Sequence, residues 1–162
     1  MKSRMYIIAG SLIAVLIIAL ALFVVLPSLS TDPSMKFKNA GALYSKSVDL
    51  ANEGKYEEAL KAADDALTLN VPQLVPLIQS NRAGILVMLG RNSEAITAAD
   101  VALSSHENLT TVFSIAYFNK GNALKNLGRT DEAKAAYAKA HELDNSLIPP
   151  DLSSVPVPPT PT

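Results

Sequence analysis

Hydrophobic residues are arranged along this chain in two patterns, and each predicts a different kind of helix. Between residues 6 and 26 they form an unbroken run without a charged side chain. From residue 33 onward they recur three or four positions apart, between polar residues, which is typical of helices that bury one face. The pattern therefore predicts an all-α chain, in which one hydrophobic helix precedes a series of amphipathic helices.

The apolar run has the length of a transmembrane helix. At about 1.5 Å per residue it forms a helix of about 31 Å, which matches a hydrocarbon core of roughly 30 Å. Pro27 marks its end, because proline is poorly tolerated inside a helix. The run also fits a cleaved signal peptide, although signal peptides usually have a shorter apolar region. We therefore predict a transmembrane anchor at residues 6–26, within an N-terminal segment 1–31.

The charges beside the run predict its orientation. Lys2 and Arg4 precede it directly, whereas Lys36, Lys38 and Lys46 follow it. Basic residues favour the cytoplasmic side, and the first two adjoin the membrane at the end of a very short tail. The predicted localisation is a single-pass membrane protein with a cytoplasmic N-terminus and an extracytoplasmic folded domain. A cleaved and secreted form is the alternative.

The rest of the chain contains an internal repeat. A glycine followed five residues later by an alanine occurs three times, with 36 residues between the first two glycines and 38 between the last two. Glycine adopts the left-handed conformation that ends a helix at little cost, so each glycine predicts a turn between two helices. One helix pair cannot bury its apolar face, but three stacked pairs can share a core. The pairs are Gly54 with Ala59, Gly90 with Ala95, and Gly128 with Ala133.

These units resemble the tetratricopeptide repeat family, whose unit is a helical hairpin of 34 residues. The third copy, 114–147, matches best, and the others are 40–73 and 76–109. The matching residues are Tyr117, Gly121, Leu124, Gly128, Ala133, Tyr137 and Ala140 in the third copy, Leu43, Leu50, Gly54, Tyr56, Ala59 and Ala66 in the first, and Ala83, Leu86, Gly90, Ala95 and Ala102 in the second.

The chain also departs from the family pattern at equivalent positions of each copy. A leucine in the middle of the family's first helix is replaced by Lys46, Arg82 and Lys120. The proline that closes the family's repeat is replaced by Val71, Glu107 and Asn145. These departures weaken the match of each single repeat, but their recurrence in phase argues against a chance pattern. The resemblance implies an α-α superhelix of three helical hairpins in a domain at residues 32–147.

The resemblance also implies a binding surface, because the first helix of each family repeat lines a concave groove that holds a peptide. Family members that clamp a C-terminal carboxylate use Lys and Asn where this chain has Tyr44 and Val48, so such a clamp is not expected. The predicted partner is an unidentified protein or peptide. The groove residues carried over are Tyr44, Val48, Asn52, Ser80, Gly84, Val87, Phe118, Asn122 and Lys125.

A second hypothesis is a structural role through homo-oligomerisation. No polar helix follows the last repeat, so Ala136, Ala140 and Leu143 are expected to be partly uncovered for another copy. Gly10 and Ala14 in the anchor offer a second means of association, since small residues four apart let membrane helices approach closely. The leading prediction remains a membrane-anchored interaction scaffold.

Charge and composition exclude several other functions. Of the 14 basic residues only Lys2 and Arg4 precede residue 32, so the rest of the chain carries 12 basic against 15 acidic residues, a net charge of −3. That balance does not favour nucleic-acid binding. No cysteine is present, and His106 and His141 lie in different repeats. Without a catalytic or metal motif, we predict no enzymatic activity, cofactor or metal.

Two further features lie outside the repeats. The segment 148–162 is rich in proline, with six prolines from residue 149 onward, and such a sequence is extended and does not join a core. We interpret it as a disordered tail, with a docking peptide as the alternative. Asn108-Leu109-Thr110 forms a glycosylation sequon in the junction between the second and third repeats. Its use depends on the side of the membrane and is left open.

Overall fold

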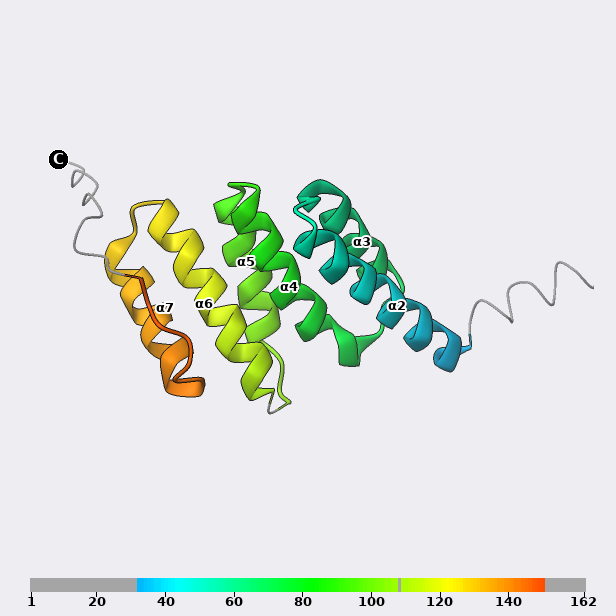
Figure 1. Cartoon of the computed structure of the whole chain (residues 1–162). Helices are drawn as coiled ribbons and strands as arrows, with labels where there is room; N and C mark the ends of the chain where they lie inside the picture. The colour runs from blue at the N-terminus through cyan, green and yellow to red at the C-terminus, as the bar shows by residue number, and fades with distance from the viewer. Residues whose placement is uncertain (1–31, 108, 151–162) are drawn as a thin grey trace, which may run out of the picture. The chain divides into compact units, whose positions relative to one another are not determined.

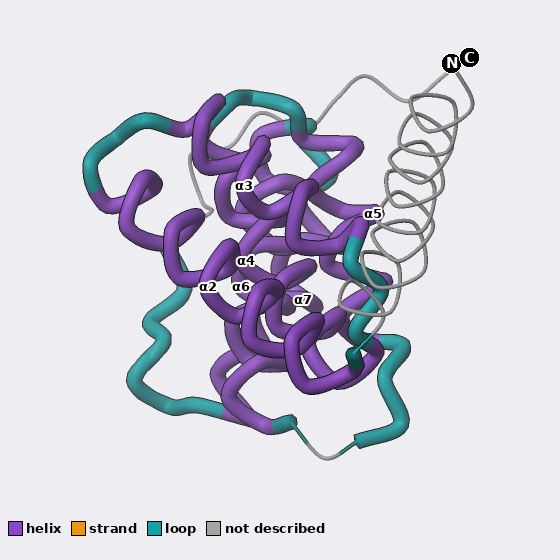
Figure 2. Tube along the Cα trace, turned by 90° about the vertical axis from the view of Figure 1, so that its right-hand side faces the viewer, coloured by secondary structure: helices purple, strands orange, loops and turns teal. Residues whose placement is uncertain are grey.

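The computed structural model describes residues 32–107 and 109–150, and these fold into α-helices and one short 3-10 helix. No strand occurs in these ranges (Figure 2). The predicted all-α architecture is therefore confirmed for the described chain. Its elements are α2 (Pro33–Asn52), α3 (Tyr56–Thr68), η1 (Pro72–Leu74), α4 (Val75–Met88), α5 (Asn92–Leu103), α6 (Thr110–Asn126) and α7 (Thr130–Leu143).

The chain divides into two compact units, Met1–Lys38 and Asn39–Thr162. The first turns of α2 belong to the first unit, and the description below concerns the second. There the helices form three consecutive hairpins, α2 with α3, α4 with α5, and α6 with α7, which follow one another in chain order (Figure 1).

Each hairpin turns at a glycine, as the repeat predicts. Gly54, Gly90 and Gly128 have φ values of 77°, 73° and 73°, in the left-handed region that favours glycine. The next residue's amide donates back to the carbonyl five residues earlier; for example, Arg91 donates to Leu86 at 2.9 Å. These bonds pair carbonyl groups that the end of a helix otherwise leaves without partners.

The interior is made largely of alanine, and small side chains let the helices approach closely. One buried cluster joins the first two hairpins to α6, and its larger members are Leu60, Ile85 and Leu86. A second lies between α6 and α7 around Leu124 and Tyr137. Together these clusters make the stacked hairpins one continuous core, which is how a repeat domain obtains its stability.

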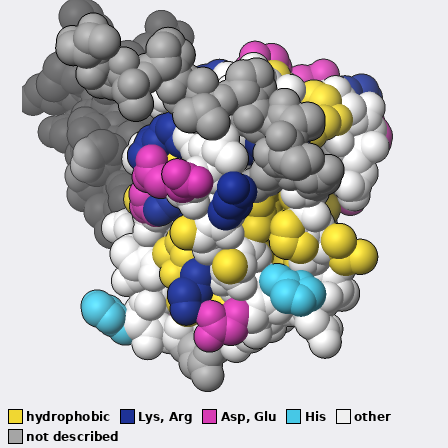
Figure 3. Space-filling model, turned by 90° about the vertical axis from the view of Figure 1, so that its left-hand side faces the viewer, with side chains coloured by type: hydrophobic (Ala, Val, Ile, Leu, Met, Phe, Trp, Pro, Cys, Tyr) yellow, Lys and Arg dark blue, Asp and Glu magenta, His cyan; other side chains and the backbone are white. Residues whose placement is uncertain are grey.

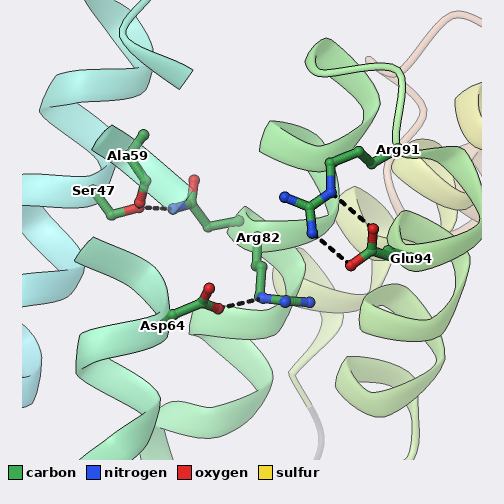
Figure 4. Close-up of polar contacts among 7 residues, drawn as sticks. Ser47, Ala59, Asp64, Arg82, Arg91 and Glu94 are labelled. Carbon is green, nitrogen blue, oxygen red and sulfur yellow. Dashed lines mark hydrogen bonds and ion pairs between the residues drawn. The ribbon is translucent and has the colours of Figure 1, made fainter. Parts of the chain in front are cut away.

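The basic residues that replace the family's leucine form ion pairs between neighbouring repeats. Arg82 Nε in α4 lies 2.7 Å from Asp64 Oδ1 in α3 (Figure 4), and Lys120 Nζ in α6 lies 2.6 Å from Asp100 Oδ1 in α5. Each pair joins the first helix of one repeat to the second helix of the repeat before it. Lys46, at the equivalent position, lies in the first hairpin of the described chain and is exposed. The recurring substitution therefore links adjacent hairpins.

A double-mutant cycle tests this link. Asp64→Asn and Arg82→Met should each destabilise the domain, with a coupling free energy of about 1 kcal/mol, the upper range for a partly exposed pair. The guanidinium side chain is 21% exposed, so water screens the pair only in part. The control is Lys61 with Asp65, a pair within α3 whose lysine side chain is 76% exposed. Urea unfolding measures both, and equal coupling in the two cycles would refute a role in joining repeats.

The predicted membrane location needs correction. Across residues 32–107 and 109–150, no helix is both long and apolar enough to cross a bilayer. This finding counts against the single-pass localisation that was expected from the sequence, with its cytoplasmic N-terminus and extracytoplasmic domain, and we withdraw it. The apolar run 6–26, together with Gly10 and Ala14, lies outside the described residues, as does Asn108 of the sequon.

The end of the repeat array also differs from the expectation. Ala136 and Ala140 are 6% and 0% exposed, so the prediction that they are uncovered is wrong, and Leu143 is half-buried. The chain after α7 turns back, and His141 Nδ1 lies 3.2 Å from the Leu147 carbonyl oxygen. The view from the side of α7 shows hydrophobic side chains interspersed with charged ones (Figure 3). Within the described residues, the array therefore ends in this returning segment and not in a further helix.

Candidate functional site

One side of α4 is left open by its four neighbouring helices. Arg82 faces α3, and Asn81 donates to Ser47 Oγ of α2 at 2.9 Å. The backbone carbonyl of Ser80 accepts a hydrogen bond from Asn119 Nδ2 of α6 at 3.1 Å. Successive residues of a helix are about 100° apart around its axis. The part of the α4 surface between its contacts with α2 and α6 is therefore formed by residues at i, i+4, i+7 and i+11. Its members are Leu77, Asn81, Gly84 and Met88, all half-buried or exposed.

The repeat places equivalent stripes on α2 and α6, and we call the three together the open face. Among its apolar members, Met88 is 60% and Ile115 is 43% exposed. None of the residues on the open face carries a charge, although acidic and basic residues are frequent elsewhere on the domain. The remaining members are Gly41, Ser45, Val48 and Asn52 on α2, and Asn119, Asn122 and Asn126 on α6.

Two asparagines on the open face are held in place by neighbouring helices. Asn81 and Asn119 each use Nδ2 for the inter-helix bonds described above. Within the described chain, the Oδ1 atom of each accepts no hydrogen bond. An amide that is fixed at one atom and free at the other can accept a hydrogen bond from the backbone N–H of an extended peptide. These amide groups therefore have little conformational entropy left to lose when they form a further hydrogen bond.

A third asparagine is oriented by the last helix. The Tyr137 hydroxyl donates to Asn122 Oδ1 at 2.8 Å, and the Tyr137 ring packs edge-to-face on Phe118 with centroids 5.5 Å apart. Burial raises the pKa of Tyr137 to about 12, so its hydroxyl remains a donor at neutral pH. The bond leaves the Nδ2 group of Asn122, with its two N–H donors, available on the open face.

The nine residues predicted from the sequence divide into two groups. Val48, Asn52, Gly84 and Asn122 lie on the open face. The other five lie beside it, on the side that faces the next helix of the array. These five residues are Tyr44, Ser80, Val87, Phe118 and Lys125.

Several residues of the second group contribute to packing. Ser80 is 3% exposed and donates to the Val112 carbonyl at 3.2 Å. Tyr44 packs on the cluster around Ile78, and Val87 packs on the main core. A partner would reach these side chains only at their edges. Their role in binding stays a prediction.

Sequence reasoning missed eight of the twelve residues of the open face. The residues it did not name are Gly41, Ser45, Leu77, Asn81, Met88, Ile115, Asn119 and Asn126. Five of the nine residues predicted from the family resemblance lie in the row of side chains next to the open face. An uncharged stripe with spacing i, i+4, i+7 and i+11, present in all three repeats, is a signal that could have found them.

Two shallow hollows lie away from the open face. One, of about 250 Å³, lies between α6 and α7 over Tyr117 and Leu124. The other, of about 440 Å³, lies between the α3–η1 corner and the end of α5, next to His106. No group of three or more histidine or carboxylate side chains in the described part of the chain is placed to hold a metal ion. Neither hollow combines with the open face into one site.

Comparison with known proteins identifies the repeat. Residues 114–147 match the family model described as "Tetratricopeptide repeat". A solved structure titled "First TPR of Spaghetti (RPAP3) bound to HSP90 peptide SRMEEVD" is similar over 67% of this chain and 81% of that chain, with a TM-score of 0.58 and 25% identity. The chain belongs to the tetratricopeptide repeat family.

The curated relatives of this tetratricopeptide chain are longer proteins. It is 34% identical over 105 residues to the Hsp70-Hsp90 organising protein of Plasmodium falciparum, covering 64% of this chain and 39% of that protein. It is 30% identical over 115 residues to the STIP1 homolog of Dictyostelium discoideum, covering 71% of this chain and 18% of that protein. The tetratricopeptide chain thus spans well under half of the curated relatives it matches.

Proposed function

We propose that this chain is a non-catalytic interaction module that binds an extended, uncharged segment of a partner protein along the open face. The module comprises three tetratricopeptide repeats at 40–73, 76–109 and 114–147, within a domain at 32–147. The observation that carries the proposal is the open face itself, which runs across α2, α4 and α6 without a charged residue. A surface of apolar and amide groups matches an extended segment better than a charged ligand.

The solved relative sharpens the choice of partner. That protein is bound to the HSP90 peptide SRMEEVD, which carries three acidic side chains. Binding such a peptide requires cations, because carboxylates removed from water without a partner are costly. Here Tyr44 and Val48 stand where carboxylate-clamping members of the family have Lys and Asn, and Lys125 lies beside the open face. We therefore propose a partner segment with neutral side chains.

Site-directed photo-crosslinking tests the proposal. A photo-reactive residue replaces Ile115, which is on the open face, and in a matched sample it replaces Ala135, which is exposed on α7. We expect crosslinks from position 115 to one contiguous partner segment, identified by mass spectrometry, and none from position 135. Leu77→Glu, which places a charge against that segment, should reduce capture roughly tenfold or more. Circular dichroism checks that the variant is folded.

Two outcomes would contradict the proposal. Equal capture from positions 115 and 135 would mean that the partner does not distinguish the open face. Capture from position 115 that is unchanged by Leu77→Glu would mean that the segment does not run across α4. Substitution of Lys61, exposed on α3, by glutamate serves as the control for a charge change elsewhere, and it should leave capture unaltered.

A further inference from the structure

We propose that the larger of the two hollows binds a lysine side chain of a partner protein. This hollow has a volume of about 440 Å³ and lies between the α3–η1 corner and the end of α5. Val75, which lines it, and Leu77, on the open face, are two positions apart and therefore point to nearly opposite sides of α4. The hollow is thus a site separate from the open face, and this inference does not rest on the proposed function.

The first argument is the apolar floor of the hollow. Val101 is 39% exposed and lines the hollow together with Val75 and Pro76. Its equivalents in the first and third repeats are Asp65 and Lys139, and each of these forms an ion pair within its own helix. An exposed aliphatic side chain at this position is therefore particular to the second repeat. The aliphatic stem of a lysine can lie on such a surface while its charged end stays at the rim.

The second argument is the set of acceptors around the floor. Glu107 lines the hollow, and its carboxylate forms no ion pair in the described chain. Among the described residues that line the hollow, none is a lysine or an arginine. The Ser104 hydroxyl donates to the Val101 carbonyl at 2.8 Å, which leaves its oxygen lone pairs as acceptors. An ammonium group, with three N–H donors and no acceptor, is the complement of such a rim.

Other ligands fit this hollow less well. A carboxylate would meet Glu107 without a cation to balance it, which is costly wherever water is displaced. A purely aliphatic chain would cover the floor but leave the rim acceptors without a donor. The volume lies near the lower end of the range of about 300 to 1,000 Å³ for small-molecule sites, and the hollow is shallow. One long basic side chain that enters from the surface of another protein suits both its size and its charge.

An NMR titration of the full chain with two peptides tests the proposal. One probe is acetyl-Ala-Ala-Lys-Ala-Ala-amide, and in the other norleucine, which has an aliphatic chain without the ammonium group, replaces the lysine. We expect saturable shifts of the Val75 and Val101 methyl signals. At low salt the lysine peptide should bind about threefold to fivefold more tightly, as for one favourable exposed ion pair, and added salt should reduce the difference.

Two variants separate the hollow from the rest of the acidic surface. Glu107→Gln should make the two peptides bind equally, because it removes the charge and keeps the size of the side chain. Asp131→Asn, which removes a fully exposed carboxylate of α7, should leave the preference for lysine unchanged. Val101→Ser removes part of the floor and should weaken the binding of both peptides. Circular dichroism checks that each variant is folded.

Three results would overturn the proposal. Equal affinity of the two peptides for the natural chain would mean that no carboxylate holds the ammonium group. A preference for lysine that survives Glu107→Gln would mean that the attraction comes from acidic residues elsewhere. Shifts that do not saturate at Val75 and Val101 would mean that the hollow is not a binding site. None of these results bears on the open face, whose crosslinks from position 115 are measured separately.

Discussion

Replacement of Tyr137 by alanine is expected to lower the free energy of unfolding by about 3 to 5 kcal/mol, the range for removing a large buried aromatic side chain. Tyr137 is 1% exposed although it stands on the last helix. Its equivalents in the first two repeats are Ala63 and Ala99, and Ala63 lies in a cluster with Ile78 from the following α4. The ring packs inside the third hairpin, edge-to-face on Phe118 and beside Gly121 of α6, where the glycine leaves room for it.

The matched variant for this prediction is Tyr137→Phe. It keeps the ring and its contact with Phe118 but removes the hydroxyl that donates to Asn122. We expect it to cost about 1 kcal/mol, the typical net value of one hydrogen bond. Urea unfolding followed by circular dichroism measures both variants. A loss below about 1 kcal/mol for Tyr137→Ala would show that the array does not depend on this ring for its closure.

Gly121→Ala should have the second largest effect. A Cβ atom at position 121 would lie 2.7 Å from two ring carbons of Tyr137, so the ring or helix α6 must move. Overpacking of this kind typically costs about 1 to 3 kcal/mol, although alanine favours a helix more than glycine does. The control is Gly41→Ala in α2, where nothing in the described structure lies within 4 Å of the added carbon. It should stabilise the domain by up to about 1 kcal/mol.

A double variant separates the clash from any other effect at position 121. When Tyr137 is already alanine, the ring is absent, and Gly121→Ala should then be neutral or stabilising in thermal and urea unfolding. A loss as large in the Tyr137→Ala background as in the natural chain would contradict the contact between the two residues. The two substitutions together therefore report on one packing interaction.

The hairpins were predictable because their signals are local. A glycine with a left-handed conformation, such as Gly90, appears in the sequence as a break between two periodic segments, and three copies in phase leave little ambiguity. The contacts between repeats were not predictable in the same way. Arg82 and Lys120 appeared only as departures from a family leucine, because their partners, Asp64 and Asp100, lie in the preceding repeat.

The open face was predictable from the sequence only in part. Asn122 and Val48, which the family resemblance placed in a groove, lie on the open face, whereas Ser80 lies in a helix contact. The predicted residues that miss the open face lie one row of side chains away from it around the helix. Which row is open depends on where each neighbouring helix packs, and the spacing of family positions does not show this. The burial of Ala136 and Ala140 at the end of the array was missed because the expectation rested on the lack of a following polar helix and not on the packing between α6 and α7.

The most direct test of the central claim, that the open face is an uncharged surface for neutral segments, is an NMR titration with two peptides. One is SRMEEVD, the peptide bound to the solved relative, and the other is SRMQQVN with an amidated end, which has no carboxylate. The account predicts that SRMEEVD shifts the amides of Leu77, Ile115 and Asn119 no more than the carboxylate-free peptide does, at both low and high salt. Saturable shifts that require the acidic peptide and fade as salt screens its charges would contradict it.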